Sequence, residues 1–379
     1  MRFVHFSDTH LGGSNFKLPE RKHDFFDAFK QVIDFCVLNK PDFIIHSGDL
    51  FDTGRPDNET ILFAIDQLKR LKAINAPLFI IPGSHDVSVD GTFISILERV
   101  GLLTNVGAPR YYEQTNNGIK LKGEVVGEAL VCGVPGHRAD IKKIYESIRP
   151  PESSKYKIFL FHHITSNVSD ASVFSDLPES LLPKGMDYYA GGHWHEFETL
   201  NHEGKPLIYP GSTEYHNVDI MERGNPRGFI YYDDKPKFIQ IKTRELIVKN
   251  VDCDGISPNE VTAKCLSELS GSNKGLIILN LNGRLAGVKS EINKLRIKSE
   301  ALSRGYLFCS VRTTNLEVPS KSFVSPRKSS LQEIEEEYLK KQGYTEPEVR
   351  LALNLMKNLG VDMKPNDLIK ALSNIRSQL

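Results

Sequence analysis

The sequence is poor in cysteine and has no long apolar run. Its 379 residues contain five cysteines, which are odd in number, scattered and without CxxC spacing: Cys36, Cys132, Cys253, Cys265 and Cys309. This pattern argues against a disulfide framework and against a zinc knuckle, and it favours ordinary thiols. No stretch approaches the roughly 18 apolar residues of a membrane span, and the start, MRFVHFSDTH, already carries histidine and aspartate. We therefore expect a soluble, cytoplasmic protein without a membrane partner.

The chain also lacks an excess of charge of either sign. Lysine and arginine together number 48, and aspartate and glutamate together also number 48. No global field would therefore draw the protein to nucleic acid or to an anionic membrane, so any phosphate binding must be local. The length is enough for about two or three domains, and hence for an enzyme with accessory parts.

Residues 1–243 carry short β-type runs that alternate with segments of helical period or with loops. In the segment HDFFDAFKQVIDFCVLNK, apolar residues recur near the helical period and form one face: Phe25, Phe26, Phe29, Ile33, Cys36 and Val37. Strand runs separated by such helices are typical of layered α/β domains. We therefore predict an α/β fold with layered sheets and helices on the outside.

The remainder of the chain changes character twice. Residues 244–317 have a strand–helix–strand–helix–strand order, which predicts a small separate α/β domain. Residues 318–330 are rich in Ser, Pro and Lys and are predicted to be a linker, whereas 331–379 consist of short amphipathic helices. These helices would bury little by themselves, so two hypotheses stay open: a tail packed on the protein's own body, or a partner-binding module.

Potential metal ligands follow five of the apolar runs. The motifs are SDTHLG with Asp8 and His10, HSGDLFD with Asp49, PGSHD with Ser84 and His85, FLFHH with His162, and GGHWH with His193 and His195. In open α/β sheets the carboxyl ends of the strands form the ligand-binding edge. So many polar groups gathered there would be costly unless a cation bound them.

The donor types indicate the chemistry. Mixed carboxylate and imidazole ligands suit manganese, iron or zinc better than calcium. Two such ions, about 3.5–4 Å apart, would activate water and neutralise a phosphate during in-line displacement. The sequence therefore predicts phosphoester hydrolysis. A serine-hydrolase triad made of Ser84, His85 and Asp86 is disfavoured because triad members converge from separate segments.

The motifs DTHLG, GDLFD, GSHD, FHH and GHWH, followed by YPGSTEY, resemble those of the calcineurin-like metallophosphoesterases. Within that superfamily the chain is similar to the archaeal branch of the meiotic-recombination-eleven type of DNA double-strand-break repair nucleases, whose bacterial counterpart is SbcD. The resemblance is specific over residues 1–243. It implies a manganese-dependent 3′–5′ exonuclease and single-strand endonuclease with a small DNA-capping domain.

The resemblance also implies roles for individual residues. It implies two Mn²⁺ ions per subunit, the first held by Asp8, His10, Asp49 and His195, and the second by Asp49, His162, His193 and the residue at position 84. His85 matches the family's catalytic histidine, and Asp86 is expected to orient its imidazole. Asp52 is left open, as a neighbour of the ligands or as a turn carboxylate.

Ser84 departs from the family pattern, in which an asparagine amide oxygen binds the second metal. A hydroxyl is shorter and is a poorer ligand while protonated, so we expect second-site affinity to fall by about 10–100-fold. The leading hypothesis is a weakened nuclease. The alternatives are a dimeric DNA-bridging scaffold with weakened catalysis, and a phosphodiesterase or phosphatase of the same superfamily.

The implied partners are double-strand DNA ends, single strands, a second copy of the chain, and a coiled-coil ATPase of the radiation-sensitive-fifty or SbcC type that would bind residues 331–379. The expected location is therefore nucleoid-associated. The dimer helices would be ETILFAIDQLKRL and TFISILERVG. Candidate phosphate contacts, each of which is equally consistent with plain surface charge, are Lys17, Arg21, Lys22, Arg55, Arg223 and Arg227.

Overall fold

The computed structural model describes residues 1–88, 91–136, 140–169 and 175–318, together with residues 340, 345–347, 349 and 350. The chain divides into two compact units, Met1–Val318 and Pro319–Leu379. Apart from these few positions, the predicted helices of 331–379 lie outside the described residues, and so does nearly all of the predicted linker. Within the described ranges, no helix combines the length and apolarity that crossing a membrane requires.

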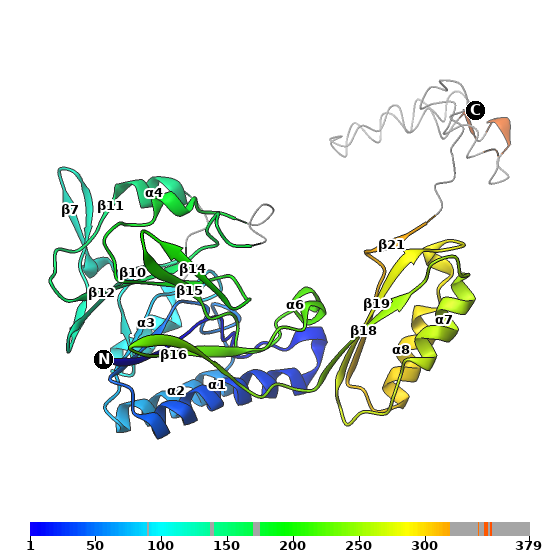
Figure 1. Cartoon of the computed structure of the whole chain (residues 1–379), viewed down its shortest axis with the longest axis horizontal. Helices are drawn as coiled ribbons and strands as arrows, with labels where there is room; N and C mark the ends of the chain where they lie inside the picture. Colours follow the sequence, from blue (N-terminus) through cyan, green and yellow to red (C-terminus); the bar gives the residue numbers. More distant parts are fainter. Residues whose placement is uncertain are drawn as a thin grey trace. The chain divides into compact units, whose positions relative to one another are not determined.

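Two six-stranded sheets form the body of residues 1–243 (Figure 1). The first has the order β17-β16-β1-β2-β3-β6, with bounds β1 Arg2–Phe6, β2 Phe43–His46, β3 Leu78–Ile80, β6 Thr104–Asn105, β16 Gly228–Asp233 and β17 Lys235–Gln240. Strands β1, β2, β3 and β6 are parallel, whereas β16 and β17 are antiparallel additions. The carboxyl ends of the parallel strands therefore meet at one edge.

The second sheet has the order β14-β15-β13-β12-β10-β9. Its bounds are β9 Glu124–Val126, β10 Ala129–Val134, β12 Tyr156–His162, β13 Tyr188–Gly192, β14 Glu198–His202 and β15 Lys205–Tyr209. Strands β10, β12, β13 and β15 are parallel. The two sheets face each other across one apolar core, to which β1, β2, β10 and β12 contribute Phe3, Ile45, Val131 and Leu160. The predicted layered α/β fold is confirmed.

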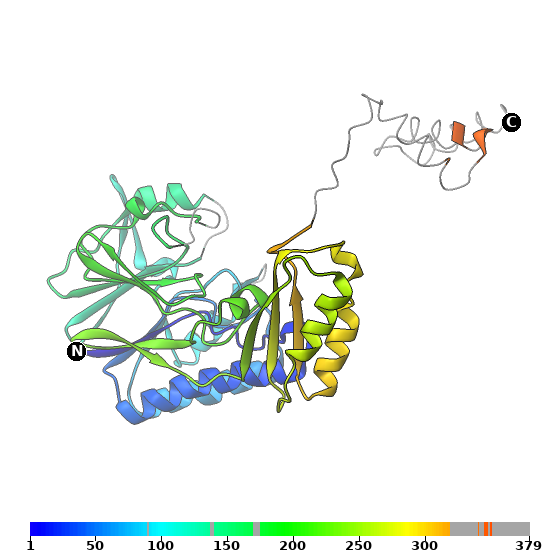
Figure 2. The same ribbon diagram turned by 45° about the vertical axis from the view of Figure 1, so that its right-hand side comes forward.

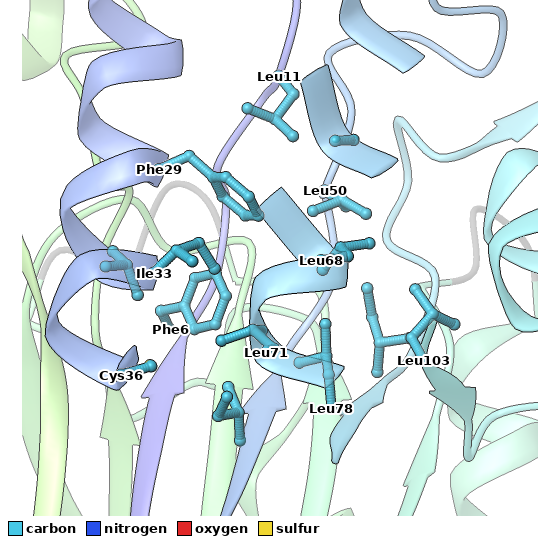
Figure 3. Close-up of a cluster of buried hydrophobic side chains, with 14 of the residues drawn as sticks. Phe6, Leu11, Phe29, Ile33, Cys36, Leu50, Leu68, Leu71, Leu78 and Leu103 are labelled. Atoms are coloured by element: carbon cyan, nitrogen blue, oxygen red, sulfur yellow. The ribbon is translucent and has the colours of Figure 1, made fainter. Parts of the chain in front are cut away.

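Helices cover the outer face of the first sheet. Helix α1 (Pro19–Asn39) and helix α2 (Asn58–Ala73) pack on it through a second apolar core, shown in Figure 3. Alternate residues of β1 face the two cores, Phe3 toward the other sheet and Phe6 toward the helices, because successive strand side chains point to opposite faces. Phe29 and Ile33 are fully buried, so the predicted apolar helix face is confirmed.

Shorter elements complete this body. Further helices among the described residues are α3 Phe93–Arg99, α4 Ile141–Ser147 and α6 Val218–Arg223, with 3-10 turns at Asn15–Lys17, Pro109–Tyr111 and Glu179–Leu181. Minor strands are β4 Val87–Ser88, β5 Gly91–Thr92, β7 Tyr112–Thr115, β8 Gly118–Leu121 and β11 Ile148–Arg149. Asp57 is the N-cap residue of helix α2, and its carboxylate accepts a hydrogen bond from the Thr60 N–H at 2.8 Å.

Residues 244–318 build a third sheet with its own core. Its parallel strands are β18 Leu246–Asp252, β19 Leu276–Arg284 and β20 Phe308–Arg312, with β21 Leu316–Glu317 beside β19. Helices α7 Pro258–Ser267 and α8 Lys294–Ser303 cover one face, as Figure 2 shows, and a 3-10 turn spans Lys289–Glu291. The predicted strand and helix order is present. The opposite face packs on α6 and on the segment before it, where Met221 and Tyr215 share an apolar cluster with Leu276 and Ile278.

The five cysteines are all buried and unpaired. Three lie in the core of residues 244–318: Cys253, Cys265 and Cys309. Burial raises the pKa of the Cys132 thiol to about 12, which keeps it protonated and unreactive at neutral pH. The prediction of ordinary thiols is confirmed.

Candidate metal centre

The residues predicted to bind metal lie together at the carboxyl ends of strands from both large sheets. Asp8 and His10 follow β1, Asp49 follows β2, Ser84 and His85 follow β3, His162 ends β12, and His193 and His195 follow β13. The sequence places each after a strand. The two sheets pack face to face and direct their parallel strands to the same edge. The ligand-type residues of one sheet therefore come within reach of those of the other.

Four of these residues have a left-handed backbone. The φ angles are 51° at Asp8, 42° at His10, 58° at Asp49 and 78° at His193. Such conformations cost of order 1–3 kcal/mol each and persist only where surrounding contacts impose them. Here backbone hydrogen bonds do so, since the Asp8 N–H donates to the Gly48 carbonyl at 3.0 Å and the His10 N–H to the Asp49 carbonyl at 3.1 Å. Strain of this kind is typical of functional sites, and the sequence motifs gave no sign of it.

The side chains form two clusters that share Asp49. Potential ligand atoms of Asp8, His10 and Asp49 lie within 4.8 Å of one another, and so do those of Asp49, His162 and His193. His195 joins the first cluster, with its Nε2 3.4 Å from Asp8 Oδ1 and 3.3 Å from His10 Nε2. A carboxylate common to both clusters is the arrangement that two neighbouring cations require.

Among the described residues, His193 Nδ1 is buried without a hydrogen-bond partner, and Asp49 Oδ2 and His162 Nε2 are buried without a well-formed hydrogen bond, although they lie 3.1 Å from each other. Burying a carboxylate oxygen and imidazole nitrogens in this way is costly unless a cation binds them. His162 is already oriented for binding, because its Nδ1–H donates to the Ser47 carbonyl at 2.7 Å and leaves Nε2 facing Asp49 at 3.1 Å. The residues therefore fit a pair of divalent metal ions.

Burial and neighbouring charges shift the pKa values of the residues in these clusters. Burial lowers the pKa of His10 and of His193 to about 4, so both imidazoles are neutral at pH 7. Burial would raise the pKa of Asp49, but the neighbouring histidines, His162 above all, hold it well below its usual range. Burial by itself would lower the pKa of His162. The neighbouring Asp49 carboxylate outweighs that effect and raises the pKa of His162 to about 10. A cation at this position would displace the His162 proton, as metal binding generally does.

His85 lies at the margin of the clusters with its ring fixed from behind. Its Nδ1 donates to the carbonyl oxygen of Asp52 at 2.8 Å, and its backbone N–H donates to Asp49 Oδ1 at 2.8 Å. The side chain is half-buried. A donating Nδ1 leaves the Nε2 of His85 available to a substrate.

A model of the family described as calcineurin-like phosphoesterase matches residues 1–197. The chain belongs to this family. Curated relatives are named DNA double-strand break repair protein Mre11. That of Sulfolobus acidocaldarius is 28% identical, and the match covers 100% of this chain and 100% of the relative. That of Saccharolobus solfataricus is also 28% identical, and the match covers 99% of each chain. That of Archaeoglobus fulgidus is 28% identical over 93% of this chain and 80% of its own length. The resemblance found in the motifs is confirmed.

Membership makes the protein a phosphoesterase and gives the clusters their chemistry, the hydrolysis of phosphate esters. The ligand-type residues named from the motifs lie within the matched residues 1–197.

The tight turns that carry the ligand-type residues leave no room for residues larger than glycine. A Cβ on Gly83 would lie 2.2 Å from Asp49 Oδ1. A Cβ on Gly48, whose φ is +99°, would lie 2.4 Å from His162 Nδ1.

The prediction that Asp86 orients the His85 imidazole is wrong. Asp86 is buried and accepts hydrogen bonds from the backbone N–H groups of Phe51 at 2.9 Å, Gly83 at 2.9 Å and Leu50 at 3.2 Å. Its carboxylate therefore joins the turn after β2 to the turn after β3. The Asp52 main chain orients His85 instead, which a side-chain motif cannot reveal.

Two of the predicted phosphate contacts are also wrong. Arg21 is fully buried and pairs with Asp24 at 2.6 Å and Glu214 at 3.0 Å. Arg227 is buried too, where it pairs with Glu196 and donates to the His195 carbonyl oxygen. Buried guanidinium groups with such partners cannot reach DNA, and the second of them holds the backbone of a predicted ligand.

The other basic candidates stay at the surface. Lys22 bonds Asp57 at 2.8 Å and also pairs with Glu59, which neutralises it locally. Lys17, Arg55 and Arg223 are exposed. Arg223 lies over the Trp194 ring at 5.3 Å, and Arg55 lines a cavity of about 340 Å³ together with His85 and Asp52. DNA contact through these three residues stays a prediction.

Ser84 is half-buried in the turn after β3. The turn lies against the metal clusters, because the His85 backbone N–H donates to Asp49 Oδ1 at 2.8 Å and a Cβ on Gly83 would lie 2.2 Å from the same oxygen. Its role as a second-site ligand stays a prediction.

The sequence analysis missed His216, whose ring lies 4.0 Å from that of His10 and whose Nε2 lies 3.0 Å from Asp52 Oδ1. Its position after strand β15, in YPGSTEYHNVD, was the available signal.

Replacing Gly83 with alanine should weaken metal binding. The added methyl would overlap both the carboxylate and the backbone nitrogen of Asp49, and displacing a ligand by such contacts is expected to lower Mn²⁺ affinity by about 10–100-fold. Isothermal titration with Mn²⁺ measures this. Gly271→Ala, where the methyl meets nothing within 4 Å, is the matched control. Equal affinity in both variants would show that the turn does not constrain Asp49.

Proposed function

We propose that this protein is a manganese-dependent DNA nuclease that processes double-strand-break ends, with 3′–5′ exonuclease and single-strand endonuclease activity. The observation that carries the proposal is the Asp49 carboxylate shared by two ligand clusters. The names of the relatives supply the substrate, since they are DNA double-strand break repair proteins. Manganese is the proposed metal because carboxylate and imidazole donors suit it.

Two bound ions would activate water and neutralise the phosphate oxygens of the substrate. The chain's own residues supply the rest. His85 keeps its Nδ1–H on the Asp52 carbonyl and presents Nε2 at the cavity. When protonated there, it donates to the 3′ oxygen as the phosphorus–oxygen bond breaks. Because the His85 backbone N–H also bonds Asp49, the proton donor and the ligand cluster have a fixed separation.

DNA would enter past local positive charge rather than through a global field. Arg55 lies beside His85 in the same cavity and Arg223 lies on α6 beside Trp194, so both are proposed to contact phosphates on either side of the reacting one. Lys17 is a third exposed cation in the loop before α1. Residues 244–318 would add surface that a small substrate does not need, which favours the nuclease over a small-molecule phosphodiesterase.

Exposed apolar residues favour a homodimer. Leu62 on α2, Ile96 on α3 and Val100 after α3 are 62%, 53% and 56% exposed, respectively. They lie on the two helices expected to pair, and a second copy would remove them from water. A coiled-coil ATPase partner at residues 331–379 and an intracellular, nucleoid-associated location belong to the same proposal. Ser84 is the feature that favours the alternative, a DNA-bridging scaffold with weakened catalysis.

His85→Ala should abolish most cleavage while leaving metal binding intact. Loss of a positioned proton donor costs about 10²–10⁴-fold in rate. The measurement is Mn²⁺-dependent cleavage of single- and double-stranded DNA by the full chain, with bound Mn²⁺ counted separately. His23→Ala, an exposed position on α1, is the control. If His85→Ala cuts DNA at the rate of the natural protein, the assigned role fails.

Ser84→Asn should strengthen the second metal site. An amide oxygen reaches further than a hydroxyl, so Mn²⁺ affinity at that site is expected to rise by about 10–100-fold and cleavage to rise at limiting Mn²⁺. Titration of both proteins with Mn²⁺ gives the affinity. Ser88→Asn, in the nearby strand β4, serves as control. Unchanged affinity and rate would mean that position 84 is not a ligand position here.

The double change of Arg55 and Arg223 to alanine should weaken DNA binding and reduce its salt dependence. Each phosphate contact contributes about one to the slope of log affinity against log salt, so the slope should fall by about two. Fluorescence anisotropy over a salt series measures this, with Lys235→Ala on β17 as control. A slope equal to that of the natural protein would remove both arginines from the interface.

A further inference from the structure

Asp52 and His216 form a hydrogen-bonded pair directly behind the candidate metal clusters. His216 Nε2 lies 3.0 Å from Asp52 Oδ1, and the same oxygen lies 3.3 Å from His10 Nδ1. An ionised carboxylate only accepts hydrogen bonds, so each nitrogen that faces it carries the proton. The Asp52 carboxylate therefore lies between the two imidazoles and contacts both.

The pair fixes the orientation of His10. With Nδ1 directed at Asp52, the opposite nitrogen of His10 points into the clusters, where it lies 3.3 Å from His195 Nε2 and 4.0 Å from Asp49 Oδ2. The ring of His216 also covers that of His10, with centroids 4.0 Å apart and planes 34° apart. A carboxylate on the outer nitrogen of a ligating imidazole sets its tautomer and raises its basicity.

His216 itself is held in place from the opposite side. Asn15 donates to its carbonyl oxygen, and Arg21 donates to the neighbouring Tyr215 carbonyl at 2.8 Å. The Tyr215 ring is buried in the cluster that contains Leu276 and Ile278 of β19. The buried Arg21 and the sheet of residues 244–318 thus both fix the segment that carries His216, so its ring is not a mobile surface group.

We propose that Asp52 is a positioning residue for the first metal position, and that His216 is the second member of this unit, holding the Asp52 carboxylate against His10. This inference rests on the proposed use of metal by the protein. Asp52 serves His85 as well, but through its main-chain carbonyl, which side-chain changes leave in place. Changes at Asp52 therefore test its support of His10 and leave the hydrogen bond of His85 intact.

The experiment is a Mn²⁺ titration of the full chain without DNA, by calorimetry and by electron paramagnetic resonance. Asp52→Asn should weaken one of the two Mn²⁺ sites by about 10–100-fold and leave the other unchanged. His216→Ala should act in the same direction. His216→Gln should restore affinity, since its amide can still donate to Asp52. Because Asp52 and His216 act together, the double variant should bind no more weakly than Asp52→Asn alone.

Asp66→Asn, an exposed carboxylate on α2, is the control for the removal of charge. Wild-type affinity at both sites in Asp52→Asn and His216→Ala would overturn the proposal. Equal weakening of both sites together with a lowered melting temperature would also overturn it, in favour of a general structural role. Since no DNA is present, these results are independent of whether the protein cuts DNA, and failure of the nuclease proposal would show itself separately in the cleavage assay.

Discussion

The carboxylate of Asp49 is the group on which the rest of the site depends. It lies between histidines from two sheets, with His162 Nε2 at 3.1 Å on one side and His10 Nε2 at 4.0 Å on the other. A buried charge of this kind is stable only when cations or charged donors surround it. The clusters, the turns and the outer hydrogen bonds can all be understood as means of keeping this carboxylate ionised, buried and in place.

The surrounding structure imposes geometry that the local chain disfavours. Asp8, His10, Asp49 and His193 adopt left-handed backbones, and glycines at the neighbouring turns leave no space for a side chain. Two sheets packed across one core supply the rigidity that this needs, since strained residues persist only where many contacts fix them. Asp86 contributes by joining two of the turns through their backbone N–H groups.

Buried arginines outside the clusters stabilise the backbone around the site. Arg227 holds the His195 carbonyl and Arg21 holds the Tyr215 carbonyl, so that two arginines that resemble DNA contacts in the sequence instead stabilise the backbone beside the site. Removing one partner of such a pair leaves an uncompensated buried charge, which costs about 3–5 kcal/mol. The site is thus connected to α1 and, through Tyr215, to the sheet of residues 244–318.

The sequence by itself determined the layered α/β fold, the helix with Phe29 and Ile33 on its buried face, and the identity of the ligand-type residues, because strand ends and apolar periodicity are local properties. Only the tertiary structure decided which charges are buried, that the Asp52 carbonyl rather than Asp86 orients His85, and that His216 lies against His10. These contacts join residues 30 to 200 or more positions apart, as in Asp52 with His216 at a separation of 164 and Arg21 with Glu214 at 193. No local pattern encodes such pairs, since they form only when strands and turns far apart in the sequence come together in the folded chain.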